Sequence, residues 1–162
     1  MKYEYYPAAY IADDLSIFEF ISSGGQGNIR KQIWFQRTTV QNIYNLAFGD
    51  LDAKGRLDDA IISDNGDRNK ILATIVRAVD LYTNRYPRRW IYFTGNAKGK
   101  TRLYRMAISL NLSELSAKFD IYCRVEGERE FVHFKKDLIV TGFLVKRRLP
   151  FARKSKIAGK NL

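Results

Sequence analysis

Two residue types that build many reactive sites are nearly absent from this chain. It contains one cysteine, Cys123, and one histidine, His133, among 162 residues. A single cysteine excludes an internal disulfide, and one cysteine with one histidine cannot complete the ligand set of a common zinc site. The sequence therefore indicates a protein that relies on its core for stability, and we expect it to work in the reducing cytoplasm.

Long apolar runs are missing as well. No stretch reaches the roughly 18 consecutive apolar residues of a membrane-spanning helix. The first residues, MKYEYYPAAYIADD, show neither the apolar region nor the cleavage site of a secretory signal. Because 46% of the residues are apolar, the chain can still bury a core, so we expect one domain and no association with membranes.

Acidic residues are scarce in the second half of the chain. Residues 1–67 contain 6 Lys and Arg against 10 Asp and Glu, whereas residues 68–162 contain 22 against 7. The last 17 residues carry 7 basic and no acidic side chains. We predict a domain over residues 1–145 and a flexible basic tail over residues 146–162, which suits nucleic acid or another polyanion. A solvated tail that aids solubility is the alternative, and the uneven charge also fits head-to-tail self-association.

Hydrophobic periodicity predicts a mixed sheet with two main helices. Apolar residues alternate in three successive segments and then recur at helical spacing. The expected strands are residues 16–21, 29–37, 42–48 and 90–94, with one or two final strands from 121–125 and 131–145; the expected helices surround residues 71–79 and 103–110. The order β-β-β-α-β-α-β-β predicts an α+β domain in which the third and fourth strands are parallel.

The segment GNAKGKT at residues 95–101 differs by one residue from the phosphate-binding loop of nucleotide hydrolases. That pattern needs four residues between its glycines, but here the glycines enclose three, so we exclude a hydrolase. Cations at the positive end of a helix dipole would still favour a bound anion, unless they point into water. The candidate anion-binding residues are Gly95, Lys98, Gly99, Lys100, Thr101, Arg102 and Arg105.

Six aspartates lie between residues 50 and 67. The segment DLDAKG begins like a calcium loop, but lysine at the fifth position and isoleucine at the twelfth break the pattern. Aspartates in such groups more often form turns and helix caps, so we predict no metal site. Asp64, Asn65, Gly66 and Asp67 form an acidic loop before the first helix, where their side chains suit a cap.

Three motifs resemble a bacterial family of unknown function: NLAFGD at residues 45–50, ISDNGDRNKILATI at 62–75 and FTGNAKGKTRLYRMAI at 93–108. The resemblance covers most of residues 3–145 and implies no activity. More distantly, the order of elements is similar to the GNAT-type N-acetyltransferase core without its first strand and early helices.

The GNAT resemblance implies acetyl-CoA as cofactor and Tyr104 as general acid. It places the cofactor pyrophosphate at the loop before the first helix. The sequence departs from the family there, because Asp64 and Asp67 would repel a pyrophosphate.

Two functions follow from these observations. The first is a non-enzymatic module without a cofactor that binds a phosphate-bearing or acidic partner, such as nucleic acid or an acidic protein. Its basis is the basic second half together with the aromatic residues Tyr86, Trp90, Tyr92 and Tyr104. The alternative is a GNAT-type N-acyltransferase that uses acetyl-CoA, or a relative that has lost this activity. We favour the binding module and leave open whether the protein is an enzyme.

Overall fold

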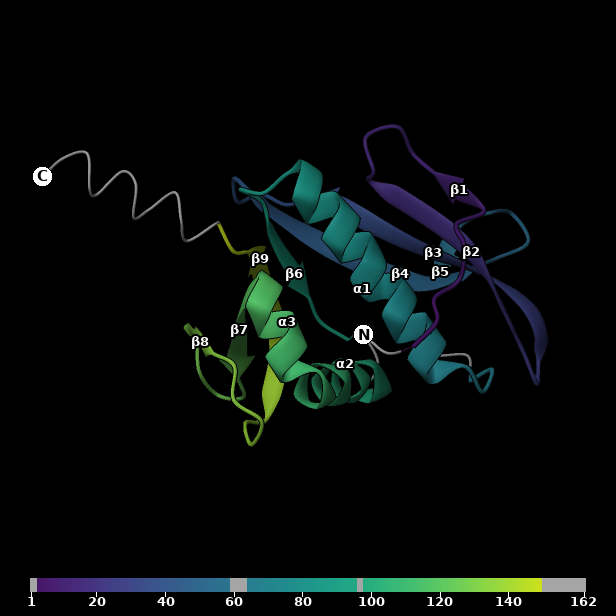
Figure 1. The fold of residues 1–162 in the computed structure, drawn as a ribbon. Coiled ribbons are helices and arrows are strands. Elements are labelled where there is room, and N and C mark those ends of the chain that lie inside the picture. The colour runs from purple at the N-terminus through teal and green to yellow at the C-terminus, as the bar shows by residue number, and fades with distance from the viewer. Residues whose placement is uncertain (1–2, 59–63, 96–97, 150–162) are drawn as a thin grey trace, which may run out of the picture.

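The computed structural model describes residues 3–58, 64–95 and 98–149, and every structural statement below concerns these residues. One sheet carries the helices on one side (Figure 1). The elements in chain order are β1 (Tyr10–Ile11), β2 (Ile17–Gly24), β3 (Gly27–Arg37), β4 (Ile43–Leu51), β5 (Leu57–Asp58), α1 (Arg68–Arg85), β6 (Trp90–Phe93), α2 (Lys98–Leu110), α3 (Leu112–Lys118), β7 (Phe119–Val125), β8 (Phe131–His133) and β9 (Val140–Arg147).

The sheet is mixed, with the strand order β1-β2-β3-β4-β6-β9-β7-β8 and β5 paired to β4. Strands β2, β3 and β4 form an antiparallel meander, and β6 then pairs parallel to β4. The last strand in the sequence, β9, inserts between β6 and β7 and is antiparallel to both. The predicted α+β class with one mixed sheet is therefore confirmed.

The structure adds elements that the periodicity did not predict. Strands β1 and β5 have two residues each, too few to show a period. Helix α3 follows α2 after Asn111, whose side chain donates to the carbonyl of Ala107 at 2.8 Å and so ends α2. The last part of the described chain holds three strands, and β9 continues to Arg147, two residues beyond the predicted end of the domain at residue 145.

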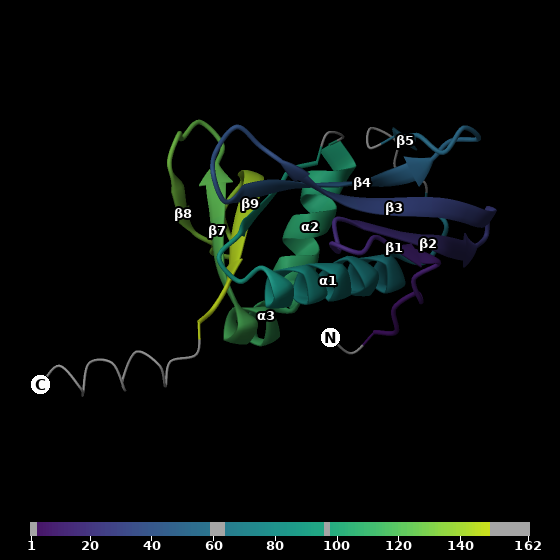
Figure 2. The same cartoon turned by 90° about the horizontal axis from the view of Figure 1, so that it is seen from above.

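The strand register places most of the buried apolar strand residues on one face. Phe18 pairs with Ile33, which pairs with Phe48. In the other half, Ile91 and Ile121 both pair with Val145. These side chains form one core cluster with residues from all three helices, so the helices lie on this side of the sheet (Figures 1 and 2). We call the two sides the helix-covered face and the uncovered face.

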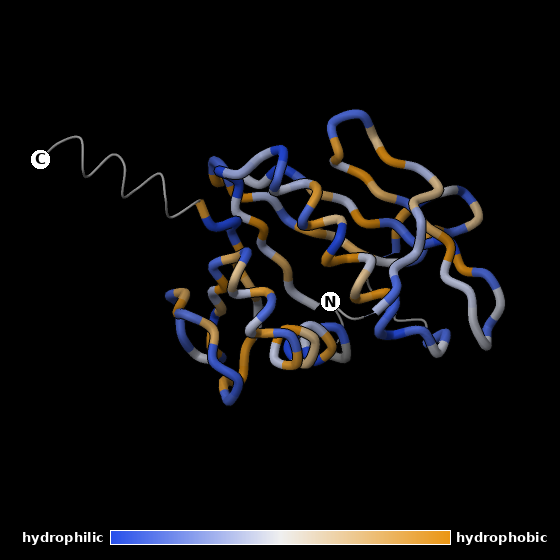
Figure 3. The backbone as a smooth tube through the Cα atoms, viewed as in Figure 1, coloured by the Kyte–Doolittle hydropathy of each residue, from blue (hydrophilic) through white to orange (hydrophobic). Residues whose placement is uncertain are grey.

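Hydropathy along the backbone follows this arrangement (Figure 3). Hydrophobic and hydrophilic residues alternate along the strands and helices, whereas the tip of the loop between β1 and β2 and the turn between β7 and β8 are hydrophilic (Figure 3). The strand side chains that do not enter the core therefore lie on the uncovered face.

Candidate functional site

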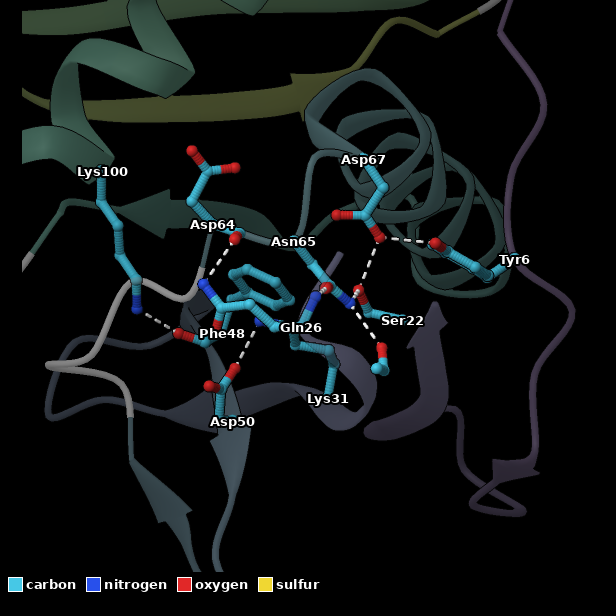
Figure 4. A network of polar contacts seen from close by, with 11 residues as sticks. Tyr6, Ser22, Gln26, Lys31, Phe48, Asp50, Asp64, Asn65, Asp67 and Lys100 are labelled. Atoms are coloured by element: carbon cyan, nitrogen blue, oxygen red, sulfur yellow. Dashed lines mark hydrogen bonds and ion pairs between the residues drawn. The ribbon is translucent and has the colours of Figure 1, made fainter. Parts of the chain in front are cut away.

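The corner between β6 and α2 contains most of the predicted anion-binding residues, and the side chains of two of them form hydrogen bonds with the protein backbone. Lys100 is 4% exposed, and its Nζ donates to the backbone carbonyl of Phe48 on β4 (Figure 4). The Thr101 hydroxyl accepts from the Gly95 N–H at 3.0 Å and so closes the turn. Lys100 therefore serves an internal contact in this conformation.

The position of Lys100 follows from the way β4 and β6 separate. Their parallel pairing covers three residue pairs, from Ile43 opposite Trp90 to Asn45 opposite Tyr92. Beyond this point β4 continues to Leu51 without β6 as a partner. A buried backbone carbonyl that has no partner strand needs a hydrogen-bond donor from elsewhere. The Lys100 ammonium is that donor for the Phe48 carbonyl.

The other predicted residues of the corner differ in exposure. Arg102 is exposed and Arg105 is half-buried, while the Lys98 side chain and the exposure of Gly99 lie outside the described part of the structure. Tyr104 is buried, and its ring packs edge-on against Phe93 at 5.2 Å between centroids. Anion binding at this corner stays a prediction, with Arg102 and Arg105 as its accessible cations.

The predicted acidic loop before α1 is tied to the β2–β3 hairpin by Asn65, which is 3% exposed. Its side-chain amide donates to the Ser22 hydroxyl at 3.0 Å and to the Gly27 carbonyl at 2.9 Å, and its oxygen accepts from the Gln26 N–H at 2.6 Å (Figure 4). Gly24 lies so close that a Cβ there would be 1.8 Å from the Asn65 carbonyl oxygen. These hydrogen bonds and the close approach of Gly24 therefore hold the loop before α1 against the β2–β3 hairpin.

Asp67, at the start of α1, also turns toward the hairpin. Its Oδ2 accepts from the hydroxyls of Tyr6 and Ser22, each at 2.5 Å (Figure 4). Its Oδ1 is buried with no hydrogen-bond partner among the described residues. Burial, assisted by the hydrogen bond to Asp67, raises the pKa of Tyr6. We call Tyr6, Ser22, Asn65, Asp67 and Lys100 the internal polar network.

This arrangement does not fit the cofactor site that the GNAT resemblance implies. A pyrophosphate at a helix start needs bare backbone N–H groups. Here Asp64 and Asp67 place carboxylates at that start, and Asp67 already has one buried oxygen without a donor. A second anion would add repulsion at the same point. Acetyl-CoA stays a prediction of the alternative function.

The described residues give no support to a metal site or to Cys123 as a nucleophile. Within the described ranges, no group of three or more His, Cys, Asp or Glu side chains is placed to hold a metal ion. Cys123 is fully buried, and burial raises the pKa of its thiol, so it is a poor nucleophile. None of the described helices is both long and apolar enough to cross a membrane.

The uncovered face carries a group of aromatic side chains on β6, β7 and β8. Tyr92 and Tyr122 flank Leu144 on either side, and His133 continues the same row, because these four residues are paired across the strands. Trp90 and Phe131 extend the group above and below this row: the Trp90 ring lies 5.6 Å from Tyr122, and Phe131 lies 6.1 Å from Tyr92. We call these five aromatic residues the aromatic face.

A glycine at its centre keeps this surface flat. Gly142 on β9 lies beneath the Tyr92 ring, where a Cβ would be 3.0 Å from the hydroxyl and 3.2 Å from a ring carbon. Even an added methyl group at this position would require the Tyr92 ring to shift by a few tenths of an ångström. The five aromatic residues are half-buried or exposed, so their rings remain accessible.

Two cations lie on the rings of the aromatic face. The Arg124 guanidinium is 4.8 Å from the Phe131 ring centroid, and the Lys146 ammonium is 5.3 Å from that of Trp90. Among the described residues neither forms an ion pair, and the Arg124 Nε is buried without a hydrogen-bond partner. The nearby Asp120 is already paired with Arg148 at 3.0 Å. The face thus combines rings with uncompensated positive charge.

The comparisons with known proteins give a family. A family model described as a family of unknown function (DUF6934) matches residues 2–148. The chain belongs to this family. No curated protein and no solved structure matches the chain. The DUF6934 match ends one residue after β9, so it includes the whole aromatic face and leaves out the last basic residues of the tail.

The sequence indicated part of the aromatic face and missed the rest. Trp90 and Tyr92 are among the aromatic residues named beside the basic half. Tyr122, Phe131 and Arg124 were not connected with them, because β9 separates β6 from β7 in the sheet although it follows both in the sequence. The alternation of Tyr122 and Arg124 with buried Ile121 and Cys123 was the available signal.

Proposed function

We propose that this DUF6934 protein is a binding module for single-stranded nucleic acid and that the aromatic face is its interface. The observation that carries the proposal is the juxtaposition of accessible rings with unpaired cations on an open sheet surface. Bases stack on aromatic side chains, and each stacked base contributes roughly 1–3 kcal/mol. Arg124 and Lys146 would contact the phosphates between the stacked bases.

The shape of the surface favours a single strand over a duplex. In a duplex the bases are already stacked and their flat faces are not available to a protein ring. An open sheet with aromatic residues in neighbouring strands offers flat contacts at the spacing of a few nucleotides. The net charge of +11 attracts any polyanion, and stacking on the flat rings then favours single strands among them.

Fluorescence anisotropy with labelled single strands tests the proposal. We expect binding that weakens as salt increases, with a slope of about −0.7 for each phosphate contacted, and weaker binding to duplex of the same length. Tyr122→Leu should weaken binding about tenfold because it removes one stacking ring. Tyr10→Leu is the matched control, since Tyr10 is 52% exposed on β1 at the far edge of the sheet. Equal effects of both variants, or binding that ignores salt, would overturn the proposal.

One observation supports the alternative function, an N-acyltransferase. The parallel pairing of β4 and β6, with α1 between them in the chain and α2 after β6, agrees with the order that the GNAT resemblance implies. Calorimetry with millimolar acetyl-CoA tests it, and Tyr104→Phe tests the suggested general acid. Saturable heat and an activity lost in Tyr104→Phe without loss of binding would favour the transferase. We expect no such heat, because carboxylates occupy the start of α1.

A further inference from the structure

A hollow of about 720 Å³ lies beyond the aromatic face, between the end of α1 and the ends of β3 and β4. Its lining includes Trp34, Arg37, Tyr44, Tyr82, Tyr86 and Arg89. Pockets of roughly 300–1,000 Å³ are typical of small-molecule sites. We infer that this hollow binds the phosphate monoester of a nucleotide, either a free mononucleotide or the 5′-terminal phosphate of a bound strand.

Arg89 is held in a fixed position by tyrosines. Its guanidinium lies 3.8 Å from the Tyr86 ring centroid and 4.3 Å from that of Tyr44. One nitrogen donates to the Tyr82 hydroxyl at 2.7 Å. Because this is the side chain's one hydrogen bond within the described residues, most of its N–H donors remain for a ligand. A guanidinium that is already ordered loses little entropy when it binds phosphate.

The tyrosines are themselves anchored. Tyr82 is 1% exposed and stacks on Phe35 at 4.0 Å between ring centroids. The Tyr86 hydroxyl donates to the backbone carbonyl of Asp14 at 2.9 Å. The first contact connects the end of α1 to β3 and the second connects it to the loop between β1 and β2, so both fix the surroundings of Arg89.

A second arginine completes the cationic side of the hollow. Arg37 pairs directly with Tyr44 across β3 and β4, which places it next to the ring that Arg89 contacts. Arg37 forms no ion pair within the part of the chain that the structure describes. Two guanidinium groups can bind a doubly charged terminal phosphate more strongly than a diester.

The opposite side of the hollow suits a base or a ribose. Trp34 is 38% exposed and lines the hollow, although it belongs to the uncovered face of β3. Asp14 also lines the hollow, and hydrogen bonds from the Ser16 side chain and backbone lower the pKa of its carboxyl. The ionised carboxylate can accept from ribose hydroxyls while the arginines hold the phosphate.

The hollow connects to the proposed interface through the chain itself. Arg89 immediately precedes Trp90, the first residue of β6 and a member of the aromatic face. Arg89 contacts Tyr44, Tyr82 and Tyr86 on the helix-covered side, whereas the Trp90 side chain belongs to the uncovered face, so a strand whose 5′ phosphate contacts Arg89 would reach Trp90 by passing around the start of β6. In its strand-bound form the inference rests on the proposed function, whereas the mononucleotide form does not.

Paired oligonucleotides that differ in the 5′ group test the inference. We expect a 5′-phosphorylated single strand to bind about tenfold more tightly than the same strand with a 5′ hydroxyl. Arg89→Lys and Arg37→Ala should each abolish this preference and leave binding of the 5′-hydroxyl strand within about twofold. Arg88→Ala is the control, because Arg88 is exposed and does not line the hollow.

Adenosine monophosphate and adenosine, measured by calorimetry, separate the two sources of the phosphate. If both strands bind equally and the monophosphate gives no heat, the inference fails while the proposed function stands. If neither strand binds but the monophosphate does, and Arg89→Lys removes its binding, the proposed function fails and the hollow is a mononucleotide site. If none of these ligands binds, both are overturned.

Discussion

The internal polar network and the aromatic face show two opposite uses of polar side chains. In the network, Asn65 and Lys100 are nearly inaccessible and contact backbone atoms of distant segments. On the aromatic face, Arg124 and Lys146 contact only rings and pair with no acid among the described residues. Polar groups that are satisfied internally stabilise the fold, and those left unsatisfied at a surface are available to a ligand. Variants of the first group should therefore change stability, and variants of the second should change binding.

Asn65→Ala should give the largest effect. It removes three side-chain hydrogen bonds between the loop before α1 and the β2–β3 hairpin. At about 1 kcal/mol for each bond, the free energy of unfolding should fall by about 3 kcal/mol. Urea denaturation measures it, with Asn28→Ala on the exposed end of the hairpin as control. A loss no larger than that of the control would mean that the loop is not held by Asn65.

Lys100→Met should have the next largest effect on the free energy of unfolding. It removes the donor to the Phe48 carbonyl while keeping most of the apolar stem, so we expect a loss of about 1–3 kcal/mol in the free energy of unfolding. Arg102→Met, in the same turn of α2 but exposed, should change stability by less than about 0.5 kcal/mol. If Lys100→Met instead left stability unchanged and weakened binding of nucleic acid, the corner and not the aromatic face would hold the anion.

These two variants show where prediction from the sequence stops. Periodicity identified core residues of the strands, since large apolar residues recur at every second position in the pairs Phe18 and Phe20, Ile33 and Phe35, and Leu46 and Phe48. The same pattern could not show that Lys100 is buried, because its partner carbonyl lies 52 residues away and becomes available only where β4 leaves β6. The cations at GNAKGKT suggested a ligand site by their position on the helix, but an internal contact uses one of them.

The aromatic face was hard to predict for a related reason. An alternating strand shows which residues share a face, but not whether another element covers that face. Here Tyr92 and Tyr122 lie on the two sides of Leu144. They come together because β9 inserts between β6 and β7. All three helices pack on the opposite side of the sheet, so these rings stay accessible on the uncovered face.

Arg124→Met tests the other half of the comparison. We expect nucleic-acid affinity to fall about fivefold and the salt slope to decrease by about 0.7, as expected for one lost phosphate contact. The free energy of unfolding should stay within about 0.5 kcal/mol, because the variant also removes a buried Nε without a hydrogen-bond partner. Anisotropy at several salt concentrations, with denaturation of the same sample, measures both. A marked loss of stability with unchanged binding would assign Arg124 to the fold.

The smallest expected effect concerns pH. Burial raises the pKa of Tyr6 above its ordinary value of 10.0, and the hydrogen bond to Asp67 acts in the same direction. The folded state therefore holds this proton more tightly than the unfolded state, so the resulting stability is complete below about pH 10 and is lost as pH rises through the folded pKa. Tyr6→Phe should lower stability at neutral pH, since Asp67 loses a donor, but should reduce the further decline above about pH 10.

Burial also raises the pKa of Tyr82, so a decline should remain in Tyr6→Phe, smaller than in the unmodified protein. Tyr10→Phe is the control for a tyrosine that is 52% exposed and should leave the decline unchanged. Urea midpoints at closely spaced alkaline pH values measure the slope. Identical slopes for Tyr6→Phe and Tyr10→Phe would mean that the Tyr6 hydroxyl is not buried against Asp67 in solution. The internal polar network would then be open at its N-terminal side, and the contrast with the aromatic face would rest on Asn65 and Lys100 alone.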